Sequence, residues 1–314
     1  MAVTLAQAAV LSETDLQQGV IETFIIESSV LDRAPLLEIE GNAYAYNVEA
    51  SLPGVEFRAV NAGYVESTGV FNQRTESLVI LGGDADVDRF IVRTRSNLND
   101  QRAIQTRMKV KAAVFKFQDT FINGDVAVDA NAFDGLKKRL TGNQVVAAGA
   151  NGLPILGTND DDKWRFFDRL DEMSAQVDGG PDAYYMNANI LQKIQSSARR
   201  LTVFDQTVDE FGRRISRYNG IPLLDIGPKG DGTPIIPQNE VQGTATNATS
   251  IYAVKYGEDE GDGGVTGLTN GGIQVDDLGE IDAKPVLRTR IEFYCGMALF
   301  SGKAAARLTG VLNG

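Results

Sequence analysis

Carboxylates are the side chains of this sequence that could do chemistry, because histidine is absent and cysteine occurs once, at Cys295. The lack of histidine excludes Ser-His-Asp and Cys-His nucleophile systems and every metal site that needs an imidazole. A carboxylate-based or lysine-based enzyme remains a minor alternative, but no acidic group lies in a recognisable catalytic frame. We therefore expect no enzyme activity, and no catalytic, cofactor-binding or metal-binding residues.

Three clusters of acidic residues are the candidate cation sites. The alternating aspartates of 84–88 lack the glycine and the glutamate of a calcium loop, so we interpret them as an acidic strand or helix entry. The aspartates of 160–162 suit the first turn of a helix, where the dipole favours negative charge. The cluster at 258–262 is interpreted as an exposed loop tip, with a weak divalent-ion site at a subunit contact as the alternative. The members are Asp84, Asp86 and Asp88, then Asp160, Asp161 and Asp162, then Glu258, Asp259, Glu260 and Asp262.

Composition narrows the class of protein. The 314 residues carry a net charge of −12, with a pI of about 4.6, which disfavours nucleic-acid binding as the main activity. An acidic wall around DNA would still be useful, because it would not hold the polymer tightly. A single cysteine permits no intrachain disulfide and fits a reducing compartment. The absence of basic residues before Arg33 argues against a secretory signal, and no apolar run is long enough for a membrane span.

A long helix over 97–122 is the element around which the rest is organised, because this stretch contains no proline or glycine. Its apolar pattern predicts that one half buries a single face and that the other half, from Val110 onward, is nearly surrounded. Asn123-Gly124 would end it, with glycine at positive φ. Basic residues recur at every seventh position on the opposite side of the helix. We interpret this stripe as a solvated edge, with a DNA-binding face as the alternative. These residues are Arg102, Lys109 and Lys116.

An arm and a projecting hairpin precede this helix. Apolar residues at helical spacing predict a short amphipathic helix within residues 1–40, running from Leu16 to Ile25. Alternation over 44–48, a turn at 52–54 and renewed alternation over 55–59 predict a long two-stranded hairpin. Because an isolated two-stranded ribbon is marginal in water, it is either completed by another subunit or folded onto its own domain.

The second half alternates between strands and helices, which predicts a separate α+β domain over 155–285. The strand at 285–295 is the clearest, because its apolar side chains point one way and its charged side chains the other. The other expected elements are a helix at 133–140, a helix at 164–177, a strand at 184–186, a helix capped by Asn187, a strand–turn–strand at 215–227, a strand at 251–256 between loops at 227–250 and 257–280, and a short final strand.

Six stretches in this order resemble a tailed-bacteriophage major capsid protein with the Hong Kong 97-type fold. The resemblance covers almost the whole chain. The stretches are MAVTLAQAAVLS at the start, ILGGDADVDRF before the long helix, FINGD and FDGLKKRL after it, YNGIPLLDIG, and AARLTGV near the end.

The resemblance implies an α+β fold with four parts. Residues 1–40 would be an N-terminal arm that reaches another subunit, and 41–76 an extended β-hairpin loop that lies over a neighbour. Residues 77–150 and 286–314 would form a peripheral domain with a β-sheet and the spine helix 97–122. Residues 151–285 would form a mixed α/β axial domain that meets its copies at fivefold and sixfold axes.

The function implied by the resemblance is structural. The chain would assemble with itself as pentamers and hexamers into the icosahedral head that encloses the double-stranded DNA of a tailed phage. It would be made and assembled in the host cytoplasm and reside in the virion. Its other partners would be a separate scaffolding protein, a portal protein, an optional decoration protein, and packaged DNA contacted non-specifically, with no membrane and no cofactor. The alternative is the shell subunit of an encapsulin-type compartment.

Two departures from the family pattern are visible. Some members cross-link through a lysine on the extended loop, but no lysine precedes Lys109 here, so noncovalent shells are expected. No long charged scaffolding helix is evident at the N-terminus, so a separate scaffolding protein would direct assembly, or none would be needed.

Overall fold

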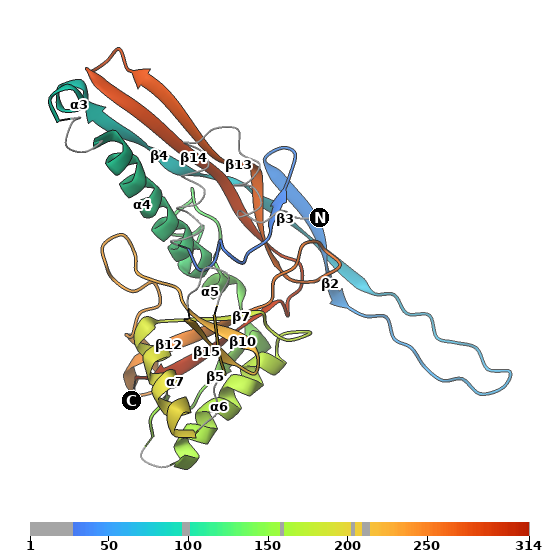
Figure 1. The fold of residues 1–314 in the computed structure, drawn as a ribbon. Coiled ribbons are helices and arrows are strands. Elements are labelled where there is room, and N and C mark those ends of the chain that lie inside the picture. The colour runs from blue at the N-terminus through green and yellow to red at the C-terminus, as the bar shows by residue number, and fades with distance from the viewer. Residues whose placement is uncertain (1–27, 96–100, 158–159, 202–204, 209–213, 314) are drawn as a thin grey trace.

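The computed structural model describes residues 28–95, 101–157, 160–201, 205–208 and 214–313. Figure 1 shows an upper sheet with a long helix beside it, a lower sheet with two helices, and a hairpin that projects sideways. Residues 1–27, which include the expected amphipathic helix of the arm, lie outside the described part. In the described residues, no helix is both long and apolar enough to cross a membrane.

The upper sheet contains four strands in the order β1-β13-β14-β4. Strand β1 is parallel to β13, and the other pairs are antiparallel. In β14, Thr289, Ile291, Phe293 and Cys295 are buried on one face, as the alternation of the sequence predicts. The bounds are β1 Leu36–Glu38, β4 Val79–Asp88, β13 Val265–Glu280 and β14 Val286–Leu299.

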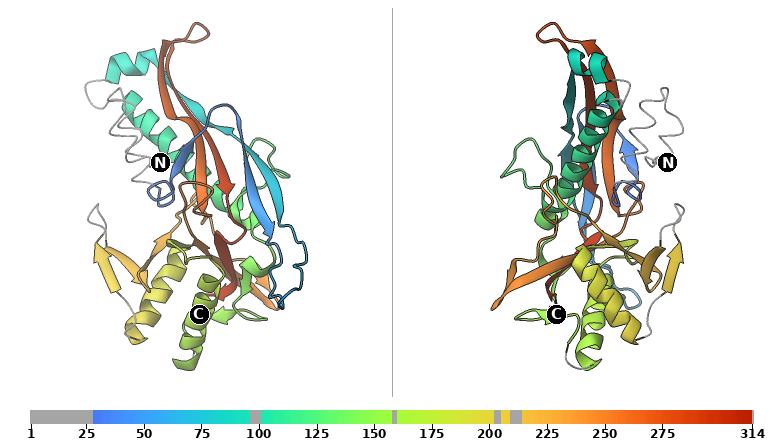
Figure 2. Two further views of the ribbon diagram at one scale, coloured as in Figure 1. Left: turned by 90° about the vertical axis from the view of Figure 1, so that its right-hand side faces the viewer. Right: turned by 60° about the vertical axis from the view of Figure 1, so that its left-hand side comes forward.

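Helix α4 (Gln101–Asn123) lies along this sheet, and Figure 2 shows it running beside the strands. Its second half buries more side chains than the first, as expected, with Phe117 packed 5.8 Å from Phe293 between ring centroids, but it is not nearly surrounded, because Lys111, Ala112 and Lys116 are exposed. In its first half, Thr106 and Val110 are the buried residues. The first half therefore still buries one face only. A short helix, α3 (Arg89–Arg95), precedes α4.

Two details of the helix differ from expectation. The helix ends at Asn123, but Gly124 is not among the residues with positive φ. Glycine is needed there for close approach instead, because a Cβ would lie 2.2 Å from the carbonyl oxygen of Phe133. The basic stripe is a solvated edge only at Lys116, whose side chain is 57% exposed: Arg102 donates to Thr289 Oγ1 at 3.0 Å, and the Lys109 side chain passes over Gly83 of the sheet.

The lower sheet contains nine strands, in the order β5-β15-β12-β7-β10-β9-β8, with β11 and β6 at its side. Strand β7 is buried on both faces: Tyr184 belongs to the core beneath α6 and α7, and Tyr185 to the core shared with α4. The strands are β5 Val145–Ala147, β6 Leu153–Pro154, β7 Ala183–Met186, β8 Asp205–Val208, β9 Arg214–Tyr218, β10 Ile221–Asp225, β11 Glu240–Gln242, β12 Ala245–Val254 and β15 Ala305–Leu312.

The helices of this region follow the predicted signals. Helix α6 (Asp160–Ala175) begins in the aspartate cluster, as the helix dipole favours. Helix α7 (Ala188–Leu201) is capped by Asn187, whose Oδ1 accepts from the Asn189 amide at 2.9 Å. The helix expected at 133–140 is shorter, α5 (Leu136–Arg139), and a 3₁₀ turn follows at Gly142–Gln144.

Sheet membership departs from the expected division of the chain at two strands. Residues 265–280, expected as loop, form the long strand β13 of the upper sheet. Gly267 permits this, because a Cβ there would lie 2.5 Å from Leu36 of β1. Strand β15, expected with the spine helix, pairs with β12 in the lower sheet.

The start of the described chain packs on its own subunit. Val30 and Leu31 are fully buried in the core that contains Val114 of α4. Ser29 Oγ donates to the Asp225 carbonyl oxygen at 3.0 Å, and β1 follows on the edge of the upper sheet. The expected arm of residues 1–40 is therefore not wholly an extension toward another subunit, because its last part completes the core.

Candidate assembly surfaces

The projecting hairpin is formed by β2 (Ala43–Ser51) and β3 (Val70–Ser77), and its base is anchored on the chain's own core. The Tyr46 ring packs edge-on against Phe300 at 5.3 Å between centroids. The Tyr46 hydroxyl accepts from the Leu299 amide at 3.2 Å. The base of the hairpin therefore folds onto its own domain, which is one of the two alternatives that the sequence left open.

A buried ion pair fixes the same base. Arg139 Nη2 lies 2.7 Å from Glu76 Oε2, and the two side chains are 8% and 19% exposed. Arg139 Nε also donates to the Asp134 carbonyl oxygen at 2.7 Å. Two parallel contacts between a guanidinium and a carboxylate set direction as well as distance. The pair therefore orients the hairpin relative to α5.

The tip of the hairpin, residues 52–69, contains no strand, contrary to the predicted turn at 52–54 and return over 55–59. Pro53 provides no amide proton for a ladder, and these residues have no core to cover. The tip is instead held by scattered contacts across it. The Gly54 amide donates to Ser67 Oγ at 2.7 Å, and the Val65 amide donates to Glu56 Oε1 at 2.9 Å.

The tip exposes a set of large apolar side chains that no part of the described chain covers. Phe57 is fully exposed and Val55 is 95% exposed. Apolar groups gathered on one projecting segment are typical of a contact with another molecule, whereas single exposed apolar residues are ordinary. The set is Leu52, Val55, Phe57, Val60, Tyr64 and Val65.

The aspartates of 84–88 lie at the end of β4, where Asp84 and Asp86 face arginines of β14 and Asp88 Oδ1 accepts from the Phe90 amide at 2.7 Å at the entry to α3. Asp86 lies 2.7 Å from Arg288 Nε, and Asp84 lies 2.8 Å from Arg290 Nε. The hydrogen bond from its arginine lowers the pKa of each carboxyl below its usual value. The interpretation as an acidic strand or helix entry is confirmed, because Asp84 and Asp86 pair with arginines across the sheet and Asp88 caps α3. In the described residues, no group of three histidine, cysteine or acidic side chains is arranged to hold a metal ion.

We expect these Asp–Arg pairs between β4 and β14 to make the free energy of unfolding depend on pH in the acid range. Carboxyls with a lowered pKa stabilise the fold above their unfolded pKa of about 3.9, and that stabilisation is lost as the pH falls through the lowered values. Urea unfolding should therefore show the wild type to be more stable than Asp84→Asn/Asp86→Asn at pH 7, and the difference should disappear near pH 2. Asp282→Asn, in the turn after β13, is the control. If the difference in unfolding free energy between wild type and double variant stayed the same at low pH, these ion pairs would not be its cause.

The acidic cluster at 258–262 is an exposed turn, as expected. Its carboxylates accept from its own backbone: Asp262 Oδ2 from the Glu258 amide at 3.0 Å, and Asp259 Oδ1 from the Gly261 amide at 2.8 Å. Tyr44 of the hairpin donates to Glu260 at 3.1 Å. An open groove of about 760 Å³ separates this turn from the hairpin, with Phe71, Asp178, Lys255 and Phe300 among its lining residues.

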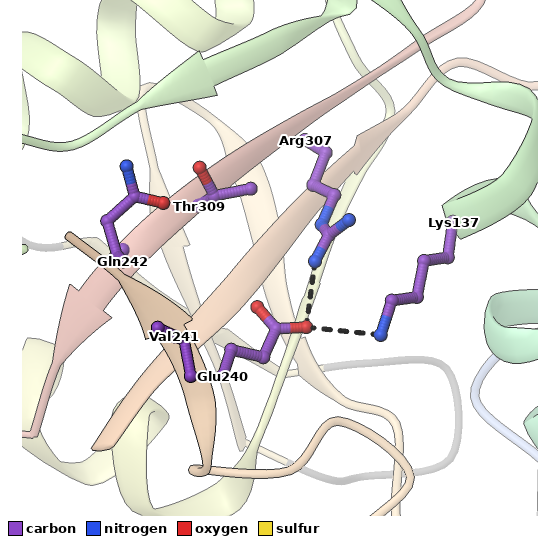
Figure 3. Close-up of a pocket in the computed structure, with 7 residues that line it drawn as sticks. Lys137, Glu240, Val241, Gln242, Arg307 and Thr309 are labelled. Carbon is purple, nitrogen blue, oxygen red and sulfur yellow. Dashed lines mark hydrogen bonds and ion pairs between the residues drawn. The ribbon is translucent and has the colours of Figure 1, made fainter. Parts of the chain in front are cut away.

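A smaller pocket of about 280 Å³ lies between α5 and the lower sheet (Figure 3). Glu240 is the centre of its charge network: Arg307 Nη2 lies 2.7 Å and Lys137 Nζ 3.5 Å from Glu240 Oε1. These two ion pairs tie α5 to β11 and β15. Sequence reasoning missed this network, because its members are far apart in the chain.

The single thiol offers no nucleophile. Cys295 is buried in the core between α4 and the upper sheet, and burial raises its pKa to about 12. A thiol with so high a pKa is protonated at neutral pH and inert.

These features define a class before any comparison is made. The chain has two sheets, a long helix and a hairpin whose tip exposes apolar side chains. Such a projecting apolar segment is typical of a contact with another molecule.

The comparisons agree with that class. A family model described as major capsid protein GP7 matches residues 13–156. The capsid of a native GTA particle is similar over 91% of this chain and 90% of that chain, with 17% identity and a TM-score of 0.65. The holo-SrpI encapsulin complex of Synechococcus elongatus PCC 7942 is similar over 100% of this chain and 97% of that chain, with 19% identity and a TM-score of 0.64. Microbacterium phage Oxtober96 is similar over 91% of each chain, with 13% identity and a TM-score of 0.57. No curated protein matches the sequence.

The resemblance to tailed-phage major capsid proteins is confirmed by the family model and by these capsid structures. The chain has the mixed helix-and-strand fold that phage capsids and encapsulin shells share. Because each identity is below 20%, the structural likenesses establish the fold and nothing further.

Proposed function

We propose that this chain is the major capsid protein of a phage-like icosahedral head. The observation that carries the proposal is the hairpin, whose base is fixed by Tyr46 and by the Glu76–Arg139 pair while its tip exposes apolar side chains. A rigid base and an uncovered apolar tip favour a contact with a second copy. The proposal extends to pentamers and hexamers that enclose double-stranded DNA.

We further propose a division of the chain that follows sheet membership. The peripheral part contains the upper sheet with α4, and the axial part contains the lower sheet with α6 and α7. The axial part then gains β15 and the peripheral part gains β13, relative to the boundaries expected from the sequence. The axial part would meet its copies at the symmetry axes, and the tip of the hairpin would lie over a neighbour.

An encapsulin-type shell is the second candidate, and one observation favours it. The SrpI encapsulin is similar over the full length of this chain. The two candidates differ in contents, since a phage head encloses its genome and an encapsulin encloses a cargo protein.

Negative-stain microscopy with mass measurement of the purified protein tests the proposal. Isometric shells are expected, and genomic DNA inside particles from infected or induced cells would exclude the encapsulin alternative. A stable monomer under all conditions would contradict both. Expression of the chain alone adds a test of partners: closed, uniform shells would argue against a required scaffolding protein.

Shells of this protein should be noncovalent. The tip of the hairpin, like all residues before Lys109, contains no lysine and cannot supply an amine for an isopeptide bond to a neighbour. Particles boiled in denaturant should therefore run as a single band of about 34 kDa on a gel. A ladder of covalent oligomers would show that cross-linking uses another amine.

A further inference from the structure

The upper sheet ends in an open strand edge at β4. This strand pairs with β14 on one side, and no strand of the described chain lies on its other side. Its ten residues pair with β14 without a register shift, so the free edge is regular along its length. An open edge presents a row of backbone N–H and C=O groups, which proteins commonly blunt with proline, lysine or a bulge. The sequence VILGGDADVD contains neither proline nor lysine, so this edge can accept a further strand.

The opposite edge of the sheet is less suitable for pairing. Strand β1 already covers β13 at 267–269. Beyond that point the register of β13 shifts between Thr269 and Ile273 and again between Asp277 and Gly279. Such bulges bend a strand and interrupt its ladder. Of the two edges, β4 therefore offers the regular one.

The tip of the hairpin carries extended backbone that has few partners. Its two arms, 52–59 and 62–69, run outward and are joined by a turn at 60–61 (Figure 1). Within the described structure, the tip forms one hydrogen bond between backbone groups, from the Ala62 amide to the Ala59 carbonyl oxygen at 3.1 Å. The arms are therefore strand-like in shape, but they do not form a ladder with each other.

The amides of the first arm divide between two sides. The Gly54 amide points toward the second arm, where it donates to Ser67 Oγ at 2.7 Å. Because successive amides of an extended chain point in opposite directions, those of Val55, Phe57 and Ala59 point away from the second arm. These three amides are directed outward, where a strand edge of another molecule could accept them.

Strand β4 has one apolar face and one charged face. Ala85 and Val87 are buried on the face toward α4, where the Lys109 side chain passes over Gly83. Asp84 and Asp86 lie on the other face and are paired with arginines of β14, so they do not repel a strand as free charges would. A strand that continues this sheet would need the same division of its side chains.

The first arm of the tip has that division. Val55, Phe57 and Ala59 alternate with Glu56 and Arg58, so an extended arm is apolar on one face and charged on the other. The lengths also fit, because the eight residues of the arm span about 26 Å and the ten residues of β4 about 33 Å at about 3.3 Å per residue.

The hairpin points away from the β4 edge of its own chain. Its base is fixed by Tyr46 and by the Glu76–Arg139 pair. In Figure 1 the hairpin projects to the right, whereas β4 runs to the left border of the upper sheet, beside α4. A pairing between them therefore joins two copies. Contacts between opposite sides of identical subunits are head-to-tail, and they close into a ring when the rotation permits.

We propose that the arm 52–59 of one subunit adds as a further strand to the β4 edge of the next subunit. Val55, Phe57 and Ala59 continue the apolar face, and Glu56 and Arg58 lie on the face of the Asp–Arg pairs. Backbone hydrogen bonds provide the contact, and the alternating side chains set its register. The inference rests on the proposed shell and names the surface to which the tip of the hairpin binds.

Cysteine cross-linking in assembled shells tests this pairing. Arg58→Cys/Ile80→Cys places one thiol on the arm and one on the charged face of β4, while Cys295 is buried. A short bismaleimide should produce a ladder of covalent oligomers on a denaturing gel, with a peptide that joins positions 58 and 80. Arg58→Cys/Val241→Cys is the matched control and should remain a single band. Val241 is 71% exposed and Ile80 72%, but Val241 lies on β11 of the lower sheet.

A proline at an outward amide tests whether the backbone makes the contact. Ala59→Pro removes such an amide, whereas Ala59→Val keeps it. The protein concentration at which shells first appear should rise several-fold more for Ala59→Pro than for Ala59→Val. Equal concentration thresholds for the two variants would overturn the strand addition, because side chains alone would then make the contact.

The remaining outcomes separate this inference from the proposed shell. Shells that form without a cross-link between positions 58 and 80, or with equal ladders from the test pair and the control pair, would overturn the strand addition and leave the shell intact. A product with the gel mobility of a monomer would show that the arm lies on its own chain. A stable monomer under all conditions would contradict the shell and this inference with it.

Discussion

A subunit carrying Val55→Ser and Phe57→Ser is expected to fold normally and to assemble poorly. Both side chains are exposed in the single chain, so their loss removes no contact within it. In the proposed shell both would be buried against a neighbour, and burial of such side chains stabilises by about 1.5–3 kcal/mol each. A loss of about 3 kcal/mol per contact weakens association roughly a hundredfold. Each subunit would make this contact, so the effect is repeated over the whole shell.

The measurement is the protein concentration at which shells first appear, followed by light scattering and microscopy. Val241→Ser is the matched control, since it removes an exposed apolar side chain from the lower sheet, and it should assemble as the wild type does. Urea unfolding of the unassembled subunit should give the same free energy for the double variant and the wild type. Shells at the wild-type concentration threshold would show that the tip makes no essential contact.

Elements with a strong local signal were predictable from the sequence. Strand β14 follows from its alternation, and the buried second half of α4 from its dense apolar residues. The β9–β10 turn follows from Asn219-Gly220, both at positive φ, where these residue types are favoured. In each case the local pattern and the tertiary environment agree.

The sequence-based predictions are wrong where contacts between distant parts of the chain determine the structure. Strand β13 is rich in glycine, threonine and asparagine and bulges between Thr269 and Ile273, so its composition indicates a loop. It is a strand because β1 and β14 pair with it on both sides. Likewise Arg102 belongs to a basic stripe in sequence, yet it contacts Thr289, which is 187 residues away. Periodicity does not contain such pairings.

The candidate assembly surface was predictable only in part. Alternating Tyr44, Tyr46 and Val48 indicate a half-buried strand, and the structure buries Tyr46 and Val48. The irregular tip was missed because Val55 and Phe57 alternate as a strand would, although nothing in the chain lies against them. The anchor was missed as well, because Glu76 and Arg139 are 63 residues apart.

Arg139→Ala tests that anchor, and we expect it to lower the free energy of unfolding by about 3–5 kcal/mol. The substitution leaves the carboxylate of Glu76 largely buried without its partner, which is the costly way to break such a pair. It also removes the hydrogen bond to the Asp134 carbonyl oxygen. Urea unfolding of the unassembled subunit measures the change. Arg169→Ala is the control, because the Arg169–Glu172 pair is exposed and should contribute less than about 1 kcal/mol.

The same variant separates two ways of losing assembly. If the ion pair holds the hairpin in its direction, Arg139→Ala should assemble poorly and also be cleaved faster by protease near the base of the hairpin. Val55→Ser/Phe57→Ser should assemble poorly with unchanged cleavage there, because its base is intact. Equal free energies of unfolding for Arg139→Ala and Arg169→Ala would show that the Glu76–Arg139 pair does not anchor the hairpin. Loss of assembly in both hairpin variants, with loss of stability in Arg139→Ala alone, would assign orientation to the base and contact to the tip.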